Sequence, residues 1–256
     1  MLILLATLIF FTRLPFWRLI DVPAEEFKRV VPRWPFIGWL TGGMMVLTIW
    51  VSSHVFPLTV AWILALLVRL VLTGCLHEDG LADFIDGFGG GTSREKTLAI
   101  MKDSHIGTFG VIGLIVYYAL LLQLPAVLPM QTLCVMVFCG DCWAKCCAAQ
   151  LINFLPYART EETAKNKTVY NRMNLRELLL CFFCGLAPSF IFTFALGWLP
   201  VRFCLLLIVP ILVMLLLRIV MKRKIQGYTG DCCGAAFLLC ELSLYLAVLA
   251  AYPYWF

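Results

Sequence analysis

Charged residues are scarce in this sequence of 256 residues: Asp, Glu, Lys and Arg together make up 14% of it, while hydrophobic residues make up 62%. Soluble domains contain about 25% charged and about 45–50% apolar residues. The hydrophobic residues gather in stretches of about 20, the length that an α-helix needs to cross the hydrocarbon core of a bilayer. These proportions exclude a water-soluble globular chain and predict a multi-pass membrane protein.

Histidine is also rare, with three in the chain, and most of the twelve cysteines lie inside the hydrophobic stretches. The pairs Cys139 and Cys142, and Cys181 and Cys184, have the spacing of zinc or redox sites. However, metals and oxidants rarely reach the interior of a membrane, and three histidines provide few further ligands. We therefore interpret the cysteines as small hydrophobic core residues.

No internal repeat or low-complexity linker interrupts the chain, so residues 1–256 are predicted to form one integral membrane domain. The predicted fold class is all-α, a multi-pass transmembrane helical bundle of about seven spans plus a short N-terminal helix. Residues 1–12 are apolar but too few to cross a bilayer, and we expect them to form an interfacial or re-entrant helix rather than a signal peptide. The predicted spans are residues 36–53, 55–76, 111–130, 133–154, 178–199, 203–221 and 235–253.

Basic residues are concentrated in every second loop. The segment before the first span contains five Lys and Arg residues, and the loops 77–110, 155–177 and 222–234 contain three, five and three. The intervening loops contain one at most. By the positive-inside rule the basic loops are cytoplasmic, which predicts a cell (inner) membrane protein with a cytoplasmic active site and an external C-terminus. These loops account for the net charge of +5, so the lipid bilayer is an expected partner and nucleic acid is not.

The acidic residues are densest where the second predicted span ends. If this segment is helical, Asp79, Asp83 and Asp86 lie at about 0°, 40° and −20° around the axis and form one acidic stripe. Carboxylates on one face repel each other, so we expect a cation beside them. Mg²⁺ prefers oxygen ligands and is usually held by a few carboxylates plus substrate phosphates. The alternative interpretation is a solvated acidic helix end at the membrane boundary.

Small residues accompany the stripe, and two further polar segments are predicted to lie on the same face. Gly80 and Gly87 would leave room for a bulky phosphoester to approach. Lys102 and Asp103 offer a phosphate partner and a fourth carboxylate, although a charged helix cap is an equally good interpretation. In Tyr228-Thr229-Gly230-Asp231, backbone N–H groups could face a phosphate, and Asp231 could bind a metal or cap the last span.

Six separated motifs occur in a specific order and spacing over almost the whole chain. They are Phe11-Thr12-Arg13-Leu14-Pro15, Pro35-Phe36-Ile37-Gly38, Asp79-Gly80-Leu81-Ala82-Asp83 with Asp86-Gly87, Lys102-Asp103-Ser104 with Gly107 and Gly110, Pro156-Tyr157-Ala158-Arg159, and Tyr228-Thr229-Gly230-Asp231 with Gly234-Ala235. The set resembles the cobalamin synthase family, the adenosylcobinamide-GDP ribazoletransferases.

The resemblance implies a membrane enzyme that joins two halves of the cobalamin nucleotide loop. A hydroxyl of α-ribazole, or of its 5′-phosphate, attacks the β-phosphoryl group of adenosylcobinamide-GDP, and GMP leaves. The implied cofactor is Mg²⁺, with Asp79, Asp83 and Asp86 as ligands. The expected catalytic residues are Asp79, Asp83 and Asp103, and either Asp83 or Asp103 would accept the hydroxyl proton. The expected substrate-binding residues are Arg13, Lys102, Arg159, Thr229 and Asp231.

The chain departs from the family pattern in two places. Members carry arginine at the positions of Lys102 and His105, so bidentate phosphate contacts are not available here. Near Asp141 an arginine is expected, but this chain has Asp141 and Lys145 four residues apart inside a span. We predict that these two residues form a structural ion pair.

The sequence leaves two alternative functions open, and it leaves the oligomeric state open as well. A CDP-alcohol phosphotransferase also has an acidic membrane motif, but neither register of that motif fits here. A secondary transporter could use the intramembrane charges Arg69, Asp141 and Glu241, although no repeat is visible. Small-residue faces that include Gly38 and Gly42 could pack within the bundle or join protomers in a homo-oligomer.

Overall fold

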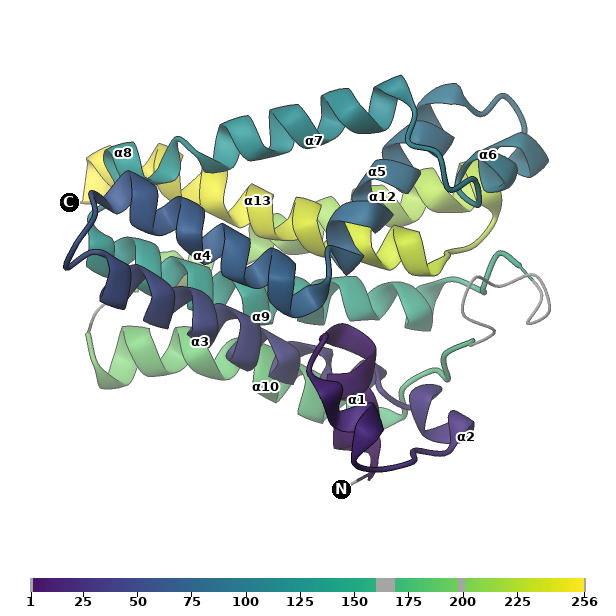
Figure 1. Ribbon diagram of the computed structural model, residues 1–256, viewed down its shortest axis with the longest axis horizontal. Helices are drawn as coiled ribbons and strands as arrows, with labels where there is room; N and C mark the ends of the chain where they lie inside the picture. The colour runs from purple at the N-terminus through teal and green to yellow at the C-terminus, as the bar shows by residue number, and fades with distance from the viewer. Residues whose placement is uncertain (1, 160–168, 198–200, 256) are drawn as a thin grey trace.

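The computed structural model describes residues 2–159, 169–197 and 201–255. Over these residues the chain is helical and contains no strand, which confirms the all-α fold class. The long helices run side by side along the bundle (Figure 1). They are α3 (Trp34–Ser52), α4 (Leu58–Thr73), α7 (Thr108–Leu121), α9 (Met130–Phe154), α10 (Leu175–Phe190), α12 (Ile208–Ile225) and α13 (Gly230–Trp255).

The predicted number of spans agrees with the helices. Six segments, built on α3, α7, α9, α10, α12 and α13, are long and apolar enough to cross a membrane, and α4 with the helix that follows it is a seventh if this bent pair counts as one span. Helix α10 contains Pro188 and continues as a π-helical turn, Ile191–Ala195. The predicted end of this span, at residue 199, lies outside the described residues.

The second predicted span, residues 55–76, ends at a sharp bend. Helix α4 ends at Thr73, and α5 (Leu76–Gly90) starts after a turn of 89°. Both linking residues have positive φ angles, 63° at Gly74 and 60° at Cys75. Glycine adopts this conformation without strain, whereas cysteine does so only when the surrounding structure imposes it. Because of the bend, the acidic segment leaves the direction of the bundle helices instead of extending the span.

The N-terminal helices and the helices around the acidic segment gather at one end of the molecule. Helices α1 (Leu2–Phe11), α2 (Ala24–Phe27), α5 and α6 (Arg94–Ile100) lie at the end opposite the C-terminus (Figure 1). Helix α1 has ten residues and is therefore about 15 Å long, about half of what a membrane span needs. The remaining short helices are α8 (Leu124–Val127), α11 (Phe203–Leu206) and the 3₁₀ turns Pro15–Arg18 and Val31–Arg33.

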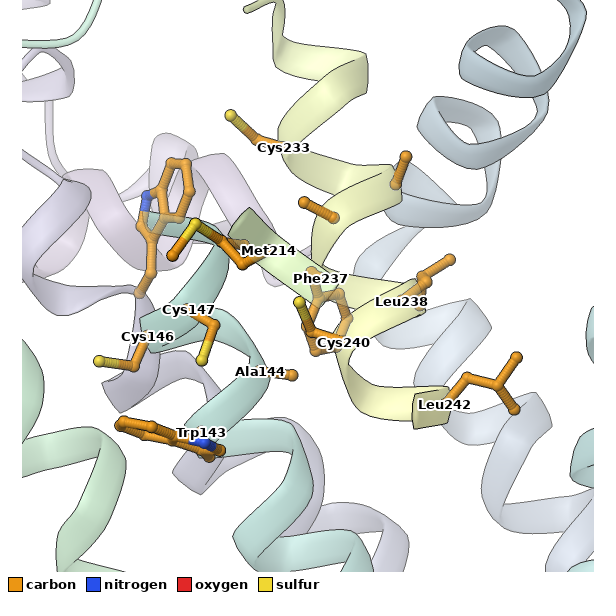
Figure 2. Close-up of a cluster of buried hydrophobic side chains, with 14 of the residues drawn as sticks. Trp143, Ala144, Cys146, Cys147, Met214, Cys233, Phe237, Leu238, Cys240 and Leu242 are labelled. Carbon is orange, nitrogen blue, oxygen red and sulfur yellow. The ribbon is translucent and has the colours of Figure 1, made fainter. Parts of the chain in front are cut away.

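Helix α9 is the centre of the bundle and is buried along most of its length. Figure 2 shows its side chains Ala144 and Cys147 on the side of α12 and α13, where Met214 and Cys240 lie, whereas Cys146 points the other way and meets Cys181 of α10 at 3.7 Å between sulfur atoms. Eight of the twelve cysteines are buried, and all twelve are free. The interpretation of the cysteines as small core residues is thereby confirmed for these eight, and it is wrong for Cys75, which is exposed at the bend after α4.

Glycines bring α3 close to α9. A Cβ atom at Gly38 would lie 2.7 Å from the Cα of Cys142, and one at Gly42 would lie 3.2 Å from the Cα of Phe138. Both distances are shorter than ordinary contacts, so a larger residue at either position would push the two helices apart. These two glycines are therefore used in packing within the bundle.

Charged side chains inside the bundle pair with each other. The Arg69 guanidinium donates two hydrogen bonds to Glu241, 2.9 and 2.7 Å long, and one to the Tyr117 hydroxyl at 3.1 Å. Lys145 donates to Asp141, which confirms the predicted ion pair, and the Thr41 hydroxyl donates to the same carboxylate at 2.6 Å. Isolated charges are costly in a membrane. Each of these charged side chains therefore contributes to the stability of the bundle only while its partner is present.

We predict that removing one partner of the Arg69–Glu241 pair is more harmful than removing both. Arg69→Met leaves the buried carboxylates of Glu241 and Glu78 without their cation and should lower the free energy of unfolding by about 3 kcal/mol, whereas Arg69→Met/Glu241→Met leaves only Glu78 and should recover part of this loss. Thermal unfolding in detergent measures the difference, with the exposed Arg18→Met as the control. A single variant at least as stable as the double variant would contradict the prediction.

Candidate active site

Helix α5 and the start of α13 touch through a glycine of the acidic segment. A Cβ atom at Gly80 would lie 3.0 Å from the carbonyl oxygen of Asp231, and one at Gly87 would lie 2.4 Å from the Met101 side chain. Both glycines are buried against neighbouring helices. The expectation that they leave space for a substrate is therefore wrong, because protein atoms already occupy that space. Gly80 lets α5 approach the backbone of Asp231, and Gly87 lets it approach Met101.

Asp79 and Asp83 line a cavity on the outer side of α5, which we call the acidic cavity. Asp103 and Lys102 line the same cavity from the segment between α6 and α7. Asp79 is exposed and Asp83 is half-buried. The fold thus brings together all three residues that the sequence predicts as catalytic, together with one predicted phosphate ligand.

Asp86 belongs to the same stripe by sequence but has a different environment. Its carboxylate is buried and accepts the backbone N–H of Gly107 at 2.7 Å and that of Gly110 at 2.9 Å. It therefore caps the N-terminus of α7, where a negative charge is favourable. Both of its oxygens are already used, so the geometry supports Asp86 as a cap, and its role as a metal ligand stays a prediction.

A second cavity, which we call the aromatic cavity, lies between α1, α3, α5 and α13. Asp79 and Asp231 line it, as do Arg159 and the rings of Trp34 and His77. Asp79 therefore borders both cavities. This shared carboxylate makes it possible for two molecules, one in each cavity, to meet at a single point.

A third hollow, the basic groove, adjoins both cavities. Arg94, Lys102 and Arg159 line it. Two of these cations also hold the protein together, since Arg159 donates to the carbonyl of Leu98 at 2.9 Å and Arg94 to that of Ala158 at 2.8 Å. Their charges are thus held in place beside the groove, which suits the binding of phosphate.

Two predicted substrate-binding residues lie outside the three hollows. Arg13 packs against the bend between α4 and α5, where a Cβ atom at Gly74 would lie 2.0 Å from its Nε. Thr229 is buried, and its hydroxyl accepts the backbone N–H of Cys232 at 3.3 Å, so it helps to begin α13. The structure gives both residues positions in which they stabilise the local fold of the site.

Asp103 is held in its ionised form by its neighbour. Hydrogen bonds from the backbone N–H and from the ring of His105 lower the pKa of this exposed carboxyl below its ordinary value. A carboxylate with a lowered pKa is a weaker proton acceptor. This weakens the case for Asp103, but a magnesium ion bound by Asp83 would weaken that carboxylate as an acceptor in the same way, so both acceptors that the sequence leaves open stay predictions.

Sequence patterns did not reveal the ring-lined cavity. Trp34, Phe11, His77 and Tyr170 come from four separate segments, and no periodic pattern connects them. The available signal was proximity to motifs, because Phe11 begins one motif and Trp34 comes directly before another. Only the packing of α1 against α3 and α5 shows that these rings surround one space.

No metal cage is formed by side chains alone in the part of the chain that the structure describes: no three His, Cys, Asp or Glu side chains lie close enough together. Asp79 and Asp83 are nevertheless one helical turn apart and face the same cavity. Mg²⁺ is commonly held by one or two carboxylates, with substrate phosphates completing the set. The two residues fit this open kind of site.

Together these features define a helical membrane protein with carboxylates and cations around adjoining cavities at one end of its bundle. Over residues 3–249 the chain matches the family described as Cobalamin-5-phosphate synthase, and it belongs to that family. No solved structure matches the chain.

Curated relatives are similar over nearly their full length. A protein of Shewanella sp. (strain W3-18-1), named adenosylcobinamide-GDP ribazoletransferase, is 34% identical over 94% of this chain and 90% of its own. Relatives with the same name from Shewanella frigidimarina and Vibrio parahaemolyticus are each 33% identical, over 94% and 95% of this chain and 91% and 90% of their own.

The capping role of Asp86 can be separated from catalysis by measuring stability. Asp86→Ala leaves the half-buried N–H of Gly107 and the buried N–H of Gly110, at the start of α7, without an acceptor and should lower the free energy of unfolding by about 1–3 kcal/mol. Asp79→Ala, on the exposed side of the same helix, should leave stability unchanged. Thermal unfolding of both variants in detergent tests this, and equal stability of the two would rule out the cap.

Proposed function

We propose that this protein is an adenosylcobinamide-GDP ribazoletransferase, which joins adenosylcobinamide-GDP to α-ribazole or its 5′-phosphate and releases GMP. Family membership and the names of its relatives support this activity. One structural observation carries the proposal: Asp79 borders both the acidic and the aromatic cavity. Two substrates bound on either side of α5 would meet at this carboxylate.

The reaction replaces one bond to phosphorus with another. The oxygen of a ribazole hydroxyl forms a bond to the β-phosphorus, the anhydride bond to GMP breaks, and its electron pair leaves with GMP. Asp83 or Asp103, which both line the acidic cavity, would accept the hydroxyl proton. Lys102 and Arg159, which line the basic groove, would neutralise the negative charge that GMP carries away.

Magnesium is the cofactor that we propose for this site. Asp79 and Asp83 would hold it together with oxygens of the substrate phosphates. When bound, it supplies positive charge that stabilises the transferred phosphoryl group. The resemblance also proposes Asp86 as a ligand, but its two backbone hydrogen bonds favour the first two residues.

Family membership favours the ribazole transfer over the two alternatives that the sequence leaves open. Neither the family description nor the names of the relatives refer to a CDP-alcohol or to transport. In addition, the intramembrane charges that a transporter could use are paired, Arg69 with Glu241 and Asp141 with Lys145.

The activity is tested by GMP release from adenosylcobinamide-GDP and α-ribazole in membranes that contain the protein. We expect the release to require Mg²⁺ and to fall by about 100-fold or more in Asp79→Asn, because preorganised charge at the reacting phosphate is lost. Asp21→Asn, a change at an exposed carboxylate outside the three hollows, is the matched control. Full turnover after chelation would overturn the metal proposal, and full turnover in Asp79→Asn would overturn the site.

The site is proposed to face the cytoplasm from the inner membrane. The basic loops predict this orientation, and the C-terminus lies at the opposite end of the bundle (Figure 1). A reporter enzyme fused after Phe256 should therefore be active on the outer face of the membrane. Cytoplasmic activity of the fusion would reverse the orientation.

A further inference from the structure

The aromatic cavity is bordered by a closed set of four rings. Phe10 and Phe11 of α1 have centroids 4.9 Å apart, Phe11 lies 5.5 Å from Trp34, Trp34 lies 5.6 Å from Tyr170, and Tyr170 lies 5.9 Å from Phe10. All four pairs meet edge to face, the arrangement that aromatic rings prefer. The rings therefore hold one another in fixed positions beside the cavity.

His77 adds a polar ring to this lining. It is stacked on Phe11 at 5.9 Å and meets Phe237 of α13 edge to face at 4.6 Å. Its side chain is 4% exposed, and its Nδ1 atom has no hydrogen-bond partner among the described residues. A polar atom is thus held among apolar rings at the wall of the cavity without a partner from the protein.

Trp34 presents a second unpartnered group. Its indole is 4% exposed, and Nε1 finds no acceptor among the described residues. Other indoles in the bundle donate to backbone carbonyls: Trp39 to Cys184 at 2.9 Å, Trp62 to Leu121 at 2.9 Å and Trp143 to Leu207 at 2.8 Å. Buried donors are rarely left without acceptors, so the N–H of this residue in the cavity wall is available to an acceptor that is not part of the protein.

We propose that the aromatic cavity binds the flat base of the nucleoside acceptor, and that Trp34 donates a hydrogen bond to a ring nitrogen of that base. This inference rests on the proposed function. The base of ribazole is a bicyclic aromatic ring with one unprotonated ring nitrogen, which matches a ring-lined space whose wall includes the unpartnered N–H donor of Trp34 and the unpartnered ring nitrogen of His77. The half-buried and exposed polar residues Asp79, Arg159 and Asp231 would face the sugar and its phosphate.

The lining distinguishes this ligand from the other substrate. Guanine presents several donors and acceptors along its edge, and a corrin ring carries many amides, so either would place polar groups against the apolar rings of Phe10, Phe11 and Phe237, although Lys145 also lines the cavity. Moreover, a base held here directs its sugar toward Asp79, which also borders the acidic cavity. The hydroxyl would then point to the place proposed for the phosphoryl group.

The test uses the full-length protein in membranes and measures KM for each substrate from GMP release. Trp34→Phe keeps an aromatic ring but removes the donor, and should raise KM for α-ribazole about 5- to 10-fold, as expected for one hydrogen bond. KM for adenosylcobinamide-GDP should not change. Trp39→Phe is the matched control, since it makes the same substitution on the same helix at an indole that is already partnered.

A ligand analogue tests the same contact without relying on the folding of a variant. An indole riboside, in which C–H replaces the free ring nitrogen, should have a KM about 5- to 10-fold higher than α-ribazole with the unaltered protein. With Trp34→Phe the two nucleosides should be equal, because the variant has already lost the donor. This double cycle isolates the bond between Trp34 and the base.

The outcomes separate the inference from the function. If the unaltered protein releases no GMP, the proposed function fails and the inference fails with it. If GMP is released but Trp34→Phe raises only KM for adenosylcobinamide-GDP, the cavity binds the other substrate and only the inference is overturned. The same conclusion follows if neither KM changes, or if Trp34→Phe still discriminates between the two nucleosides.

Discussion

The bend between α4 and α5 is the constraint on which the site depends. A continuous helix would carry Asp79 and Asp83 along the direction of the bundle helices, whereas the turn of 89° places them on a helix packed against the start of α13. The turn requires positive φ angles at Gly74 and Cys75. The surrounding packing must hold Cys75 in this conformation, since an isolated chain would avoid it.

The membrane environment explains why so many of the few charged residues are paired. Arg69 with Glu241 and Lys145 with Asp141 satisfy each other where water cannot. The Arg69 pair links α4, α7 and α13, the helices next to the bend, and therefore supports the position of α5. Stability inside the bundle and the geometry at its end are thus connected through the same helices.

Asp86 shows that one helical stripe can serve two purposes. Periodicity correctly groups it with Asp79 and Asp83, but a helix has neighbours on several sides, and the contact partner of each residue depends on which neighbour it faces. Asp86 faces the N-terminus of α7, while Asp79 and Asp83 face the acidic cavity. The same reasoning applies to Gly80. The sequence suggests free space beside this glycine, but in the structure the start of α13 fills that space.

The sequence by itself determined the fold class, the number of spans, the core role of eight of the cysteines and the ion pair of Asp141 with Lys145, because hydrophobic length and local spacing are sufficient for these. It also identified the carboxylates beside the acidic cavity, since they are close together in the chain. Only the tertiary structure decided the bend at Gly74, the capping by Asp86 and the ring-lined cavity. These features depend on contacts between residues far apart in sequence, such as Phe11, Trp34 and Tyr170, and no local pattern encodes such contacts.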